Sequence, residues 1–221
     1  GSLEEIELPF AGSITGIANT PSSPTLLLQL TAWTISPRIY LYNSAENTVQ
    51  DSGWLKPSSV DFSEIEAHEV QVPAKDGALI PLSIIHKKGL KLDGNNPTHL
   101  TGYGSYGLTL DPAFAPTTLA WYERGGVYAI AHIRGGGEYG EEWHLAGQKL
   151  NKQNTIDDFI ACAEYLIAQK YTRPEKLAGE GTSAGGIPSG GSVTKRPDLW
   201  AAMFIRVGVT NALRFEASEN G

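Results

Sequence analysis

Residues 181–185 of this chain have the spacing G-x-S-x-G, with Ser183 at the centre. An apolar segment that begins at Leu177 leads into the motif, and small residues follow it. A strand, a sharp turn and a helix in this order hold the serine in a strained conformation and lift its hydroxyl clear of the sheet. The pattern predicts nucleophilic chemistry, in which the Ser183 hydroxyl attacks a carbonyl and N–H groups of the helix stabilise the developing oxyanion.

An activated serine also needs a base that takes its proton and a third group that orients the base. In the α/β-hydrolase arrangement that a G-x-S-x-G turn indicates, the three groups follow in the order Ser, Asp, His. The five histidines all precede Ser183: His68, His86, His99, His132 and His144. Asp198 lies in an R-P-D-L turn only 15 residues after Ser183, so we do not expect it to be the acid. We therefore expect the base and the acid beyond residue 221, and impaired catalysis in the isolated chain.

Other polar clusters favour structural roles. The histidines have no HExxH or other metal-ligand spacing, so neither a metal nor another cofactor is expected. Residues 135–137 are glycines without the spacing of a phosphate-binding loop, and the adjacent Arg134 is expected to bridge loops near the site. Asp157 and Asp158 are expected in the first turn of a helix, where the helix dipole favours acidic side chains.

The composition is that of an ordinary globular protein. The 221 residues are 41% hydrophobic and 19% charged, and the net charge of −7 argues against a nucleic-acid binder. No apolar run approaches the roughly 18 residues of a membrane span, and the first residues given do not have the charged-then-apolar pattern of a signal peptide. The single cysteine, Cys162, excludes an internal disulfide and is expected to be buried.

Residues from about 3 to 56 are predicted to be all-β. Alternating segments separated by turn residues are Glu5–Leu8, Thr25–Thr34 and Arg38–Tyr42. Such short strands need neighbouring elements to enclose a core. Two more predicted strands, His68–Val72 and Leu79–His86, flank a hairpin signal at residues 75–77.

Farther along, strands alternate with helices, which indicates a parallel sheet. The expected strands are His99–Gly102, Val127–Ile133, Leu177–Glu180 and Ala201–Val207. Residues 115–124 are expected to be helical and to end at the glycine pair 125–126. The clearest helix is Thr155–Lys170, whose apolar residues recur at 3.6-residue spacing. Thr155 with Asp158 forms a predicted capping box at its start.

Several spaced segments occur in one order along the chain. They are residues 86–94 (HKKGLKLDG), 102–107 (GYGSYG), 133–140 (IRGGGEYG), 151–154 (NKQN), the G-x-S-x-G turn and 196–199 (RPDL). From about residue 60 to the end, this series resembles the prolyl oligopeptidase family of serine peptidases. That family joins a seven-bladed propeller to an α/β-hydrolase domain, and this chain resembles only part of that architecture.

The resemblance implies the fold and its domains. The expected fold class is α/β: a partial α/β-hydrolase, with a mostly parallel sheet flanked by helices, preceded by an antiparallel segment similar to a propeller blade. Residues 1–56 would be the blade-like segment, and residues 57–221 the hydrolase domain, incomplete at its C-terminal end. The chain is expected to be truncated at both ends.

The resemblance also implies roles for five residues. Ser183 matches the nucleophile of the family, and the backbone N–H of Ala184 is one expected oxyanion donor. Tyr103 matches a tyrosine whose hydroxyl supplies the other donor, although it could be only a packing residue. Tyr106 and Val209 match the walls of a proline pocket, and both could equally be core residues. A flat apolar slot suits a proline ring, which offers no N–H donor to satisfy.

The sequence departs from the family pattern around the turn. Gly179 replaces an expected apolar strand residue, and a glycine in a strand packs nothing. Thr182 stands where glycine is commoner in the family. Pro188 lies among glycines in the helix that follows, where the first turn of the helix would tolerate it.

The expected function is a serine peptidase that cleaves short peptides after proline through an acyl-enzyme on Ser183. An esterase or lipase on the same scaffold is one alternative, because fold does not fix substrate. A catalytically incomplete, non-enzymatic module is another. Expected partners are short proline-containing peptides and other copies of the chain, through unpaired strand edges, but neither nucleic acid nor membrane. A cytoplasmic location is expected, although an apparently cut N-terminus does not define the compartment.

Overall fold

The computed structural model describes residues 5–215 and 217, and these fall into two compact units. The first holds the described residues up to Ile65 together with Asp111–Ala120, and the second holds Glu66–Leu110 and the described residues from Trp121 onward. Each unit is described by itself. The predicted domain boundary between residues 56 and 57 stays a prediction, because compactness alone does not define a domain.

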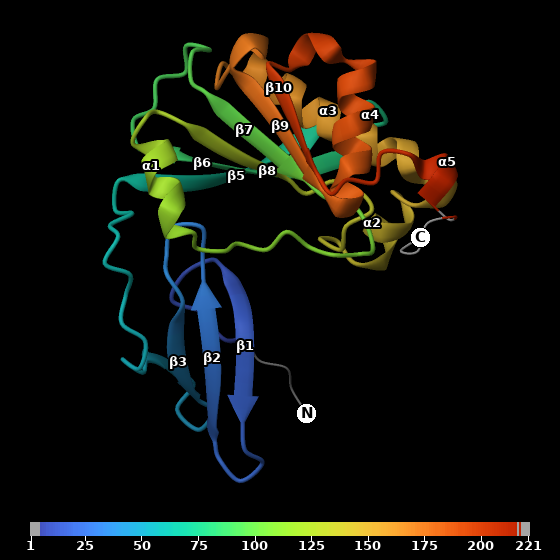
Figure 1. Cartoon of the computed structure of the whole chain (residues 1–221). Helices are drawn as coiled ribbons and strands as arrows, with labels where there is room; N and C mark the ends of the chain where they lie inside the picture. Colours follow the sequence, from blue (N-terminus) through green and yellow to red (C-terminus); the bar gives the residue numbers. More distant parts are fainter. Residues whose placement is uncertain (1–4, 216, 218–221) are drawn as a thin grey trace. The chain divides into compact units, whose positions relative to one another are not determined.

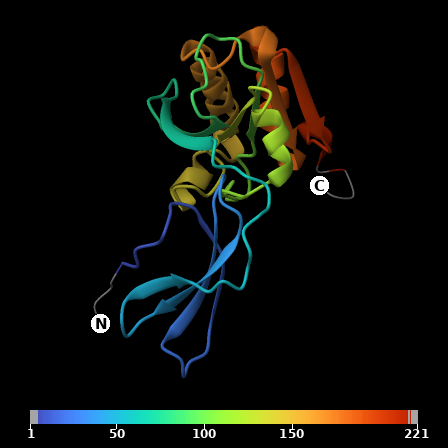
Figure 2. The same cartoon turned by 90° about the vertical axis from the view of Figure 1, so that its left-hand side faces the viewer.

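The first unit is built on an antiparallel sheet with the order β1-β2-β3-β4 (Figure 2). Its strands are β1 (Ser13–Asn19), β2 (Thr25–Thr31), β3 (Arg38–Asn43) and β4 (Thr48–Asp51). Each strand pairs with the next along the chain, as in a meander. Leu28, Leu30 and Tyr40 form its buried centre, and the ring of Phe10 meets that of Tyr40 edge-on at 6.1 Å.

The strands of this sheet differ in part from those predicted. The prediction of a strand at Glu5–Leu8 is wrong, because Leu8 packs against the core without joining the sheet. Two strands were not predicted, β1 and β4: Gly16 interrupts the alternation of β1 at an irregular point in its pairing, and β4 is short and polar. Strand β2 ends at Thr31, three residues earlier than predicted, because Ala32 N–H donates to Ile35 O and turns the chain.

The second unit contains a mixed six-stranded sheet with the order β10-β9-β7-β8-β6-β5 (Figure 1). Its strands are β5 (Ile65–Pro73), β6 (Leu79–Lys87), β7 (Thr98–Gly102), β8 (Val127–Ala131), β9 (Leu177–Thr182) and β10 (Ala202–Arg206). Strands β10, β9, β7 and β8 run parallel, and β6 is antiparallel to β8. The predicted hairpin is confirmed, because Ala74 N–H donates to Ala78 O at its turn. The partly parallel sheet with flanking helices confirms the expected α/β class.

Helices lie between successive parallel strands, and one follows the last strand. The α-helices are α1 (Leu119–Tyr122), α2 (Glu141–Leu145), α3 (Lys152–Ala168), α4 (Gly186–Lys195) and α5 (Ala212–Phe215). Short 3-10 turns are η1 (Pro116–Thr118), η2 (Lys149–Asn151), η3 (Pro174–Lys176), η4 (Ser183–Gly185) and η5 (Pro197–Leu199). Pro188 is the third residue of α4, where an N–H group has no partner within the helix, so the predicted tolerance is confirmed.

The core of this unit lies between the sheet and α3, which also packs against α4 (Figure 1). Phe159, Ile160 and Leu166 of α3 are fully buried in it, as the helical periodicity predicts. Cys162 is buried here too, which confirms its predicted packing role. The space beside Gly179 is filled by Met203 and Trp200, since a Cβ at Gly179 would lie 2.6 Å from Met203 Cε.

The predicted capping box at Thr155 is wrong. Helix α3 begins three residues earlier, at Lys152, so Thr155 and Asp158 lie inside it. The Thr155 hydroxyl is within hydrogen-bond distance of Arg134 O at 2.8 Å and Gly147 O at 3.0 Å, outside the helix.

Within the described residues, no helix has both the length and the apolar character that crossing a membrane requires.

Candidate active site

Three neighbouring strands of the second sheet end at the same edge. Strand β9 pairs in parallel with β7 on one side and with β10 on the other. Gly102, Thr182 and Arg206 are the last residues of these strands, so Tyr103 and Ser183 leave the sheet at neighbouring positions. Ligand sites of parallel sheets form outside the carboxyl ends of the strands, which makes this edge the candidate site.

The turn at Ser183 is strained, as its sequence predicts. Ser183 has a φ of 54°, in the left-handed region that residues with side chains rarely adopt. A Cβ on Gly181 would lie 2.0 Å from the carbonyl oxygen of Gly185, so the turn closes only around a glycine. The Val209 N–H donates to the Ser183 carbonyl at 2.9 Å and fixes the turn from the next loop. The exposed Ser183 is held in a conformation that costs on the order of 1–3 kcal/mol.

Tyr103 lies beside this turn. The Cβ position of Gly185 is 3.5 Å from Tyr103 Cδ2 and 3.6 Å from Tyr103 Cα, so the tyrosine packs directly against the turn. Its ring is 6.4 Å from the ring of Tyr106, at an angle of 44°. Tyr106 is exposed and has a φ of 59°, so a second strained residue stands at this edge.

A cavity of about 300 Å³ opens next to the turn. Its lining includes Ser105, Tyr106, His144, Ala184, Ile187 and Val209. Ala184 is buried in the 3-10 turn that precedes α4. The first N–H groups of a helix have no acceptor within the helix, so such a turn can offer donors to an anion. The structure therefore gathers the five predicted residues at one edge: Tyr106, Ala184 and Val209 line one cavity, and Ser183 and Tyr103 flank it.

Lys152 braces the glycine-rich segment after Tyr103. Its Nζ donates to Gly104 O at 2.5 Å and to Ser105 Oγ at 2.9 Å, and the side chain also lines the cavity. Burial lowers the pKa of Lys152 to about 8, because the charged ammonium loses water there. Gly104 has a φ of 63°, and a Cβ there would lie 2.4 Å from Thr155 Cγ2, so only glycine fits. Lys152 belongs to segment 151–154, on which the family resemblance partly rests, but no role at the site was predicted for it.

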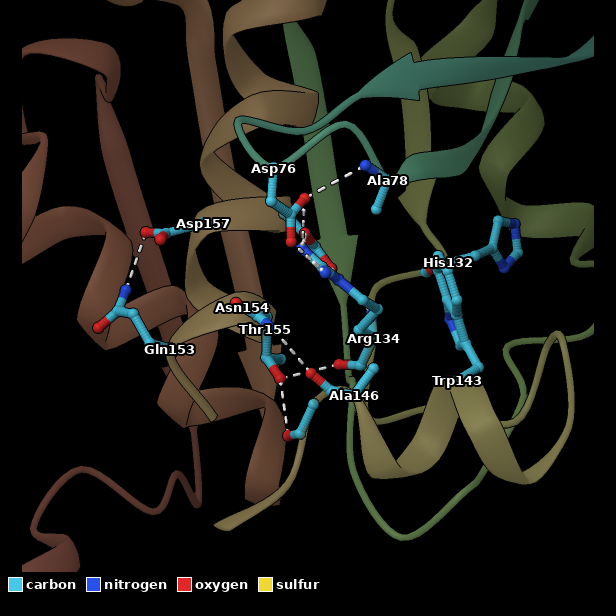
Figure 3. A network of polar contacts seen from close by, with 12 residues as sticks. Asp76, Ala78, His132, Arg134, Trp143, Ala146, Gln153, Asn154, Thr155 and Asp157 are labelled. Carbon is cyan, nitrogen blue, oxygen red and sulfur yellow. Dashed lines mark hydrogen bonds and ion pairs between the residues drawn. The ribbon is translucent and has the colours of Figure 1, made fainter. Parts of the chain in front are cut away.

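Arg134 ties two loops to α3 (Figure 3). Its Nε is 2.9 Å from Asp158 Oδ2, one terminal nitrogen is 2.6 Å from Asp158 Oδ1, and the other is 2.6 Å from Asp76 Oδ2. The hydrogen bond from Arg134 lowers the pKa of Asp76. Burial raises the pKa of Asp158, although the same guanidinium acts to lower it. The predicted bridging role of Arg134 is confirmed.

The predicted place of the two aspartates is wrong. Asp157 and Asp158 lie in the second turn of α3, because the helix starts at Lys152, so the helix dipole does not explain them. Gln153 Nε2 donates to the Asp157 carboxylate one helical turn away (Figure 3). Asp158 instead receives the Arg134 backbone N–H and guanidinium. Asp158, which was predicted for the first turn of the helix, is therefore the ion-pair partner of Arg134 in the loop before α2.

A serine, a histidine and a carboxylate also meet away from the cavity. Ser83 Oγ is 2.9 Å from His132 Nε2, and His132 Nδ1 is 3.6 Å from Glu138 Oε1. Ser83, on β6, and His132, just after β8, are both buried, so this serine is not presented to a substrate. The contacts from Ser83 through His132 to Glu138 connect β6 to the glycine-rich loop. The backbone N–H of Leu110 also donates to Glu138. We assign it a structural role.

Comparisons with known proteins agree with this architecture. The model of the prolyl oligopeptidase family matches residues 112–220. The chain is 41% identical over 212 residues to a prolyl endopeptidase of Elizabethkingia meningoseptica, covering 95% of this chain and 30% of the relative. It is 37% identical over 218 residues to a prolyl endopeptidase of Dictyostelium discoideum, covering 96% of this chain and 28% of the relative.

Solved structures are similar over nearly the whole chain. One from a structural and mechanistic study of two prolyl endopeptidases superposes with a TM-score of 0.93 at 35% identity, covering 99% of this chain and 32% of that one. Prolyl oligopeptidase B from Galerina marginata, bound to a 25mer macrocyclization substrate, gives a TM-score of 0.91 at 33% identity, covering 99% and 31%. The chain thus spans about 30% of the length of these relatives.

Proposed function

This chain belongs to the prolyl oligopeptidase family, and we propose from this premise that it carries the nucleophile and oxyanion site of a serine peptidase that cleaves after proline. The observation that carries the proposal is Ser183 at a φ of 54°, exposed where β9 ends and packed beside Tyr103. The relatives named prolyl endopeptidase support the substrate class.

In the proposed reaction, Ser183 Oγ attacks the carbonyl carbon of the proline residue and loses its proton to the base. The C–N bond to the next residue then breaks, the amine leaves with a proton, and the prolyl acyl-enzyme that remains is hydrolysed by water. The Ala184 N–H and the Tyr103 hydroxyl donate to the oxyanion of the tetrahedral intermediate. Tyr106 and Val209 line the cavity that takes the proline ring. The base is not assigned to a described residue. His144 lines the cavity, but its Nδ1 is engaged with Gly135 O at 2.9 Å.

The experiment is a full-length chimera, in which this chain replaces the matching segment of the Elizabethkingia meningoseptica prolyl endopeptidase. We expect it to hydrolyse a short proline-containing peptide and to form an acyl-enzyme, with both properties lost in Ser183→Ala. Ser189→Ala is the matched control, because Ser189 is a buried helix residue whose hydroxyl donates to Gly185 O. Peptide cleavage that persists in Ser183→Ala contradicts the proposal, as does turnover of simple esters without any turnover of the peptide.

We further propose that the chain self-associates through unpaired strand edges. Strand β10 ends the second sheet on one side, and Phe204 and Ile205 on it are exposed. An exposed apolar edge strand offers unpaired N–H and C=O groups to another chain. A cytoplasmic location stays a prediction.

A further inference from the structure

Two histidines and a glutamate meet on the hairpin of β5 and β6. Glu66 and His68 are two residues apart on β5, so their side chains lie on the same face of the sheet. His86 is near the end of β6, the neighbouring strand. One ligand atom from each residue can be chosen such that all three atoms lie within 4.8 Å of one another. The spacing of these residues along the sequence did not predict the cluster, because they come together only when β5 pairs with β6.

The distances in this cluster fit a tetrahedral metal site. His68 Nε2 is 3.5 Å from Glu66 Oε2, and His86 Nδ1 is 3.6 Å from Glu66 Oε1. A zinc ion holds imidazole nitrogen and carboxylate oxygen at about 2.0–2.2 Å, so two tetrahedral ligands stand roughly 3.3–3.6 Å apart. Each histidine therefore has a separation from the Glu66 carboxylate that such an ion requires, and side-chain adjustment within the 4.8 Å cluster would bring the third ligand into place.

The surroundings hold the histidine rings in place. The ring of His86 is buried, with its centroid 5.9 Å from that of Tyr171 and 5.3 Å from that of His68. His86 Nδ1 is also 2.9 Å from the Lys87 carbonyl oxygen, which fixes the plane of the ring. His68 is half exposed, so an ion and a water molecule can reach the open side of the cluster.

We propose that Glu66, His68 and His86 bind a divalent transition-metal ion, and that Zn²⁺ suits them best. Two imidazoles and one carboxylate form a ligand set typical of three-ligand zinc sites, with water in the fourth position. Mg²⁺ and Ca²⁺ prefer sites made of oxygen atoms. Where the ion binds Nδ1 of His86, that nitrogen gives up its hydrogen bond to Lys87 O, and the neutral ring carries its one proton on Nε2.

The test is isothermal titration of the purified, chelator-treated chain with ZnCl₂ at neutral pH. We expect saturable binding of one ion per chain, and none of comparable strength with MgCl₂. His68→Gln and Glu66→Gln should each weaken Zn²⁺ binding roughly 100-fold or more, because they remove a ligand rather than a supporting partner. Binding should also raise the thermal midpoint of unfolding, because the unfolded chain does not hold the three ligands together.

The matched control is Glu69→Gln on the same strand. Glu69 is exposed and three residues from Glu66, so its side chain lies on the opposite face of β5. It should leave the affinity for Zn²⁺ unchanged. Circular dichroism checks that each variant folds, and His68→Gln is the most tolerant change because His68 is half exposed. Absence of saturable Zn²⁺ binding, or equal binding in His68→Gln and Glu69→Gln, overturns the proposal and leaves the cluster a network of ion pairs.

Discussion

Tyr103 is the residue on which the proposed oxyanion site depends most. In the full-length chimera, Tyr103→Phe removes one hydrogen bond that is made chiefly in the transition state. Loss of an oxyanion donor costs about 10²–10³-fold in turnover. We expect that loss in kcat, with KM little changed, because the ground-state carbonyl uses the donor weakly.

The control for this change is Tyr106→Phe. Tyr106 is exposed and lines the cavity with its ring, so removal of its hydroxyl should leave kcat almost unaltered. Steady-state kinetics on a proline-containing peptide measures both variants. If a folded Tyr103→Phe chimera keeps the parent kcat, Tyr103 is a packing residue, and the Ala184 N–H needs another partner.

Arg134 contributes to stability rather than to chemistry. Arg134→Met would leave the fully buried carboxylate of Asp158 without its cation, and a buried charge that loses its partner costs about 3–5 kcal/mol. Asp76→Asn should cost far less, because half of the Asp76 side chain is exposed and solvent screens its interaction. Chemical denaturation of both variants measures the two losses. Equal losses would show that Asp158 does not depend on Arg134.

At these residues, spacing along the sequence predicted the local features but not the partners that lie far apart in the chain. The G-x-S-x-G motif predicted the strained turn because all its members are local, and the structure has Ser183 at a φ of 54°. The loop-bridging role of Arg134 was also predicted, but its partner Asp158 was assigned to a helix end, since periodicity does not fix where a helix starts. The contact of Lys152 with Gly104 was not predicted, because it exists only once α3 packs against the sheet.

At the scale of elements, helix α4 contains two adjacent glycines in different surroundings. A Cβ on Gly190 would meet only ordinary contacts, with Ile205 Cδ1 at 3.7 Å. A Cβ on Gly191 would lie 2.6 Å from Ile156 Cδ1 and 2.9 Å from Ile156 Cγ1, where α3 and α4 pack. Gly191 therefore sets the close approach of the two helices, whereas Gly190 does not.

The same substitution at these positions should have opposite effects. Gly190→Ala should stabilise the chain by up to about 1 kcal/mol, because alanine favours a helix over glycine. Gly191→Ala should destabilise it by about 1–3 kcal/mol, because Ile156 must shift in a packed interface. Thermal unfolding of the two variants provides the comparison. Stabilisation by both would mean that α3 and α4 do not pack closely at Ile156.

Elements were predictable where one segment carried its own pattern. The strands of the second sheet and helix α3 follow from apolar runs and 3.6-residue periodicity, whereas the sheet order β10-β9-β7-β8-β6-β5 does not. Strand β1 was missed because Gly16 interrupts its alternation and most of its residues are exposed, and β4 because it is short and polar. Packing on their neighbours defines both strands more than their own residues.

At the scale of the whole molecule, Lys152 links stability to pH. Its pKa in the folded chain is about 8, against 10.5 for a solvated lysine, because burial disfavours the charged ammonium. Between these values the unfolded chain binds more protons than the folded chain, so the contribution of Lys152 to stability rises with pH. Burial raises the pKa of Cys162, and this group acts in the opposite direction in the same range.

Comparison with Lys152→Met separates the two effects, since both chains contain Cys162. The free energy of unfolding of the parent chain, relative to the variant, should increase as pH rises from about 8 toward 10.5. Denaturant titrations at several pH values give this difference. A difference that stays constant with pH would show that the ammonium of Lys152 keeps its water in the folded chain.

Self-association is the property that depends most on the whole chain. Strand β10 is an edge of the second sheet, and Phe204, Ile205 and Val207 along it and just after it are exposed. The net charge of −7 opposes association, but its effect weakens as salt screens it. We therefore expect the sedimentation coefficient to rise with protein concentration, and more steeply at high salt.

Ile205→Lys should lower this rise, because a lysine on an edge strand disfavours pairing with another edge. Leu79→Lys is the control, because Leu79 is similarly exposed but starts β6, which has neighbours on both sides. A concentration-independent monomer, or an equal effect of both lysines, would contradict association through β10.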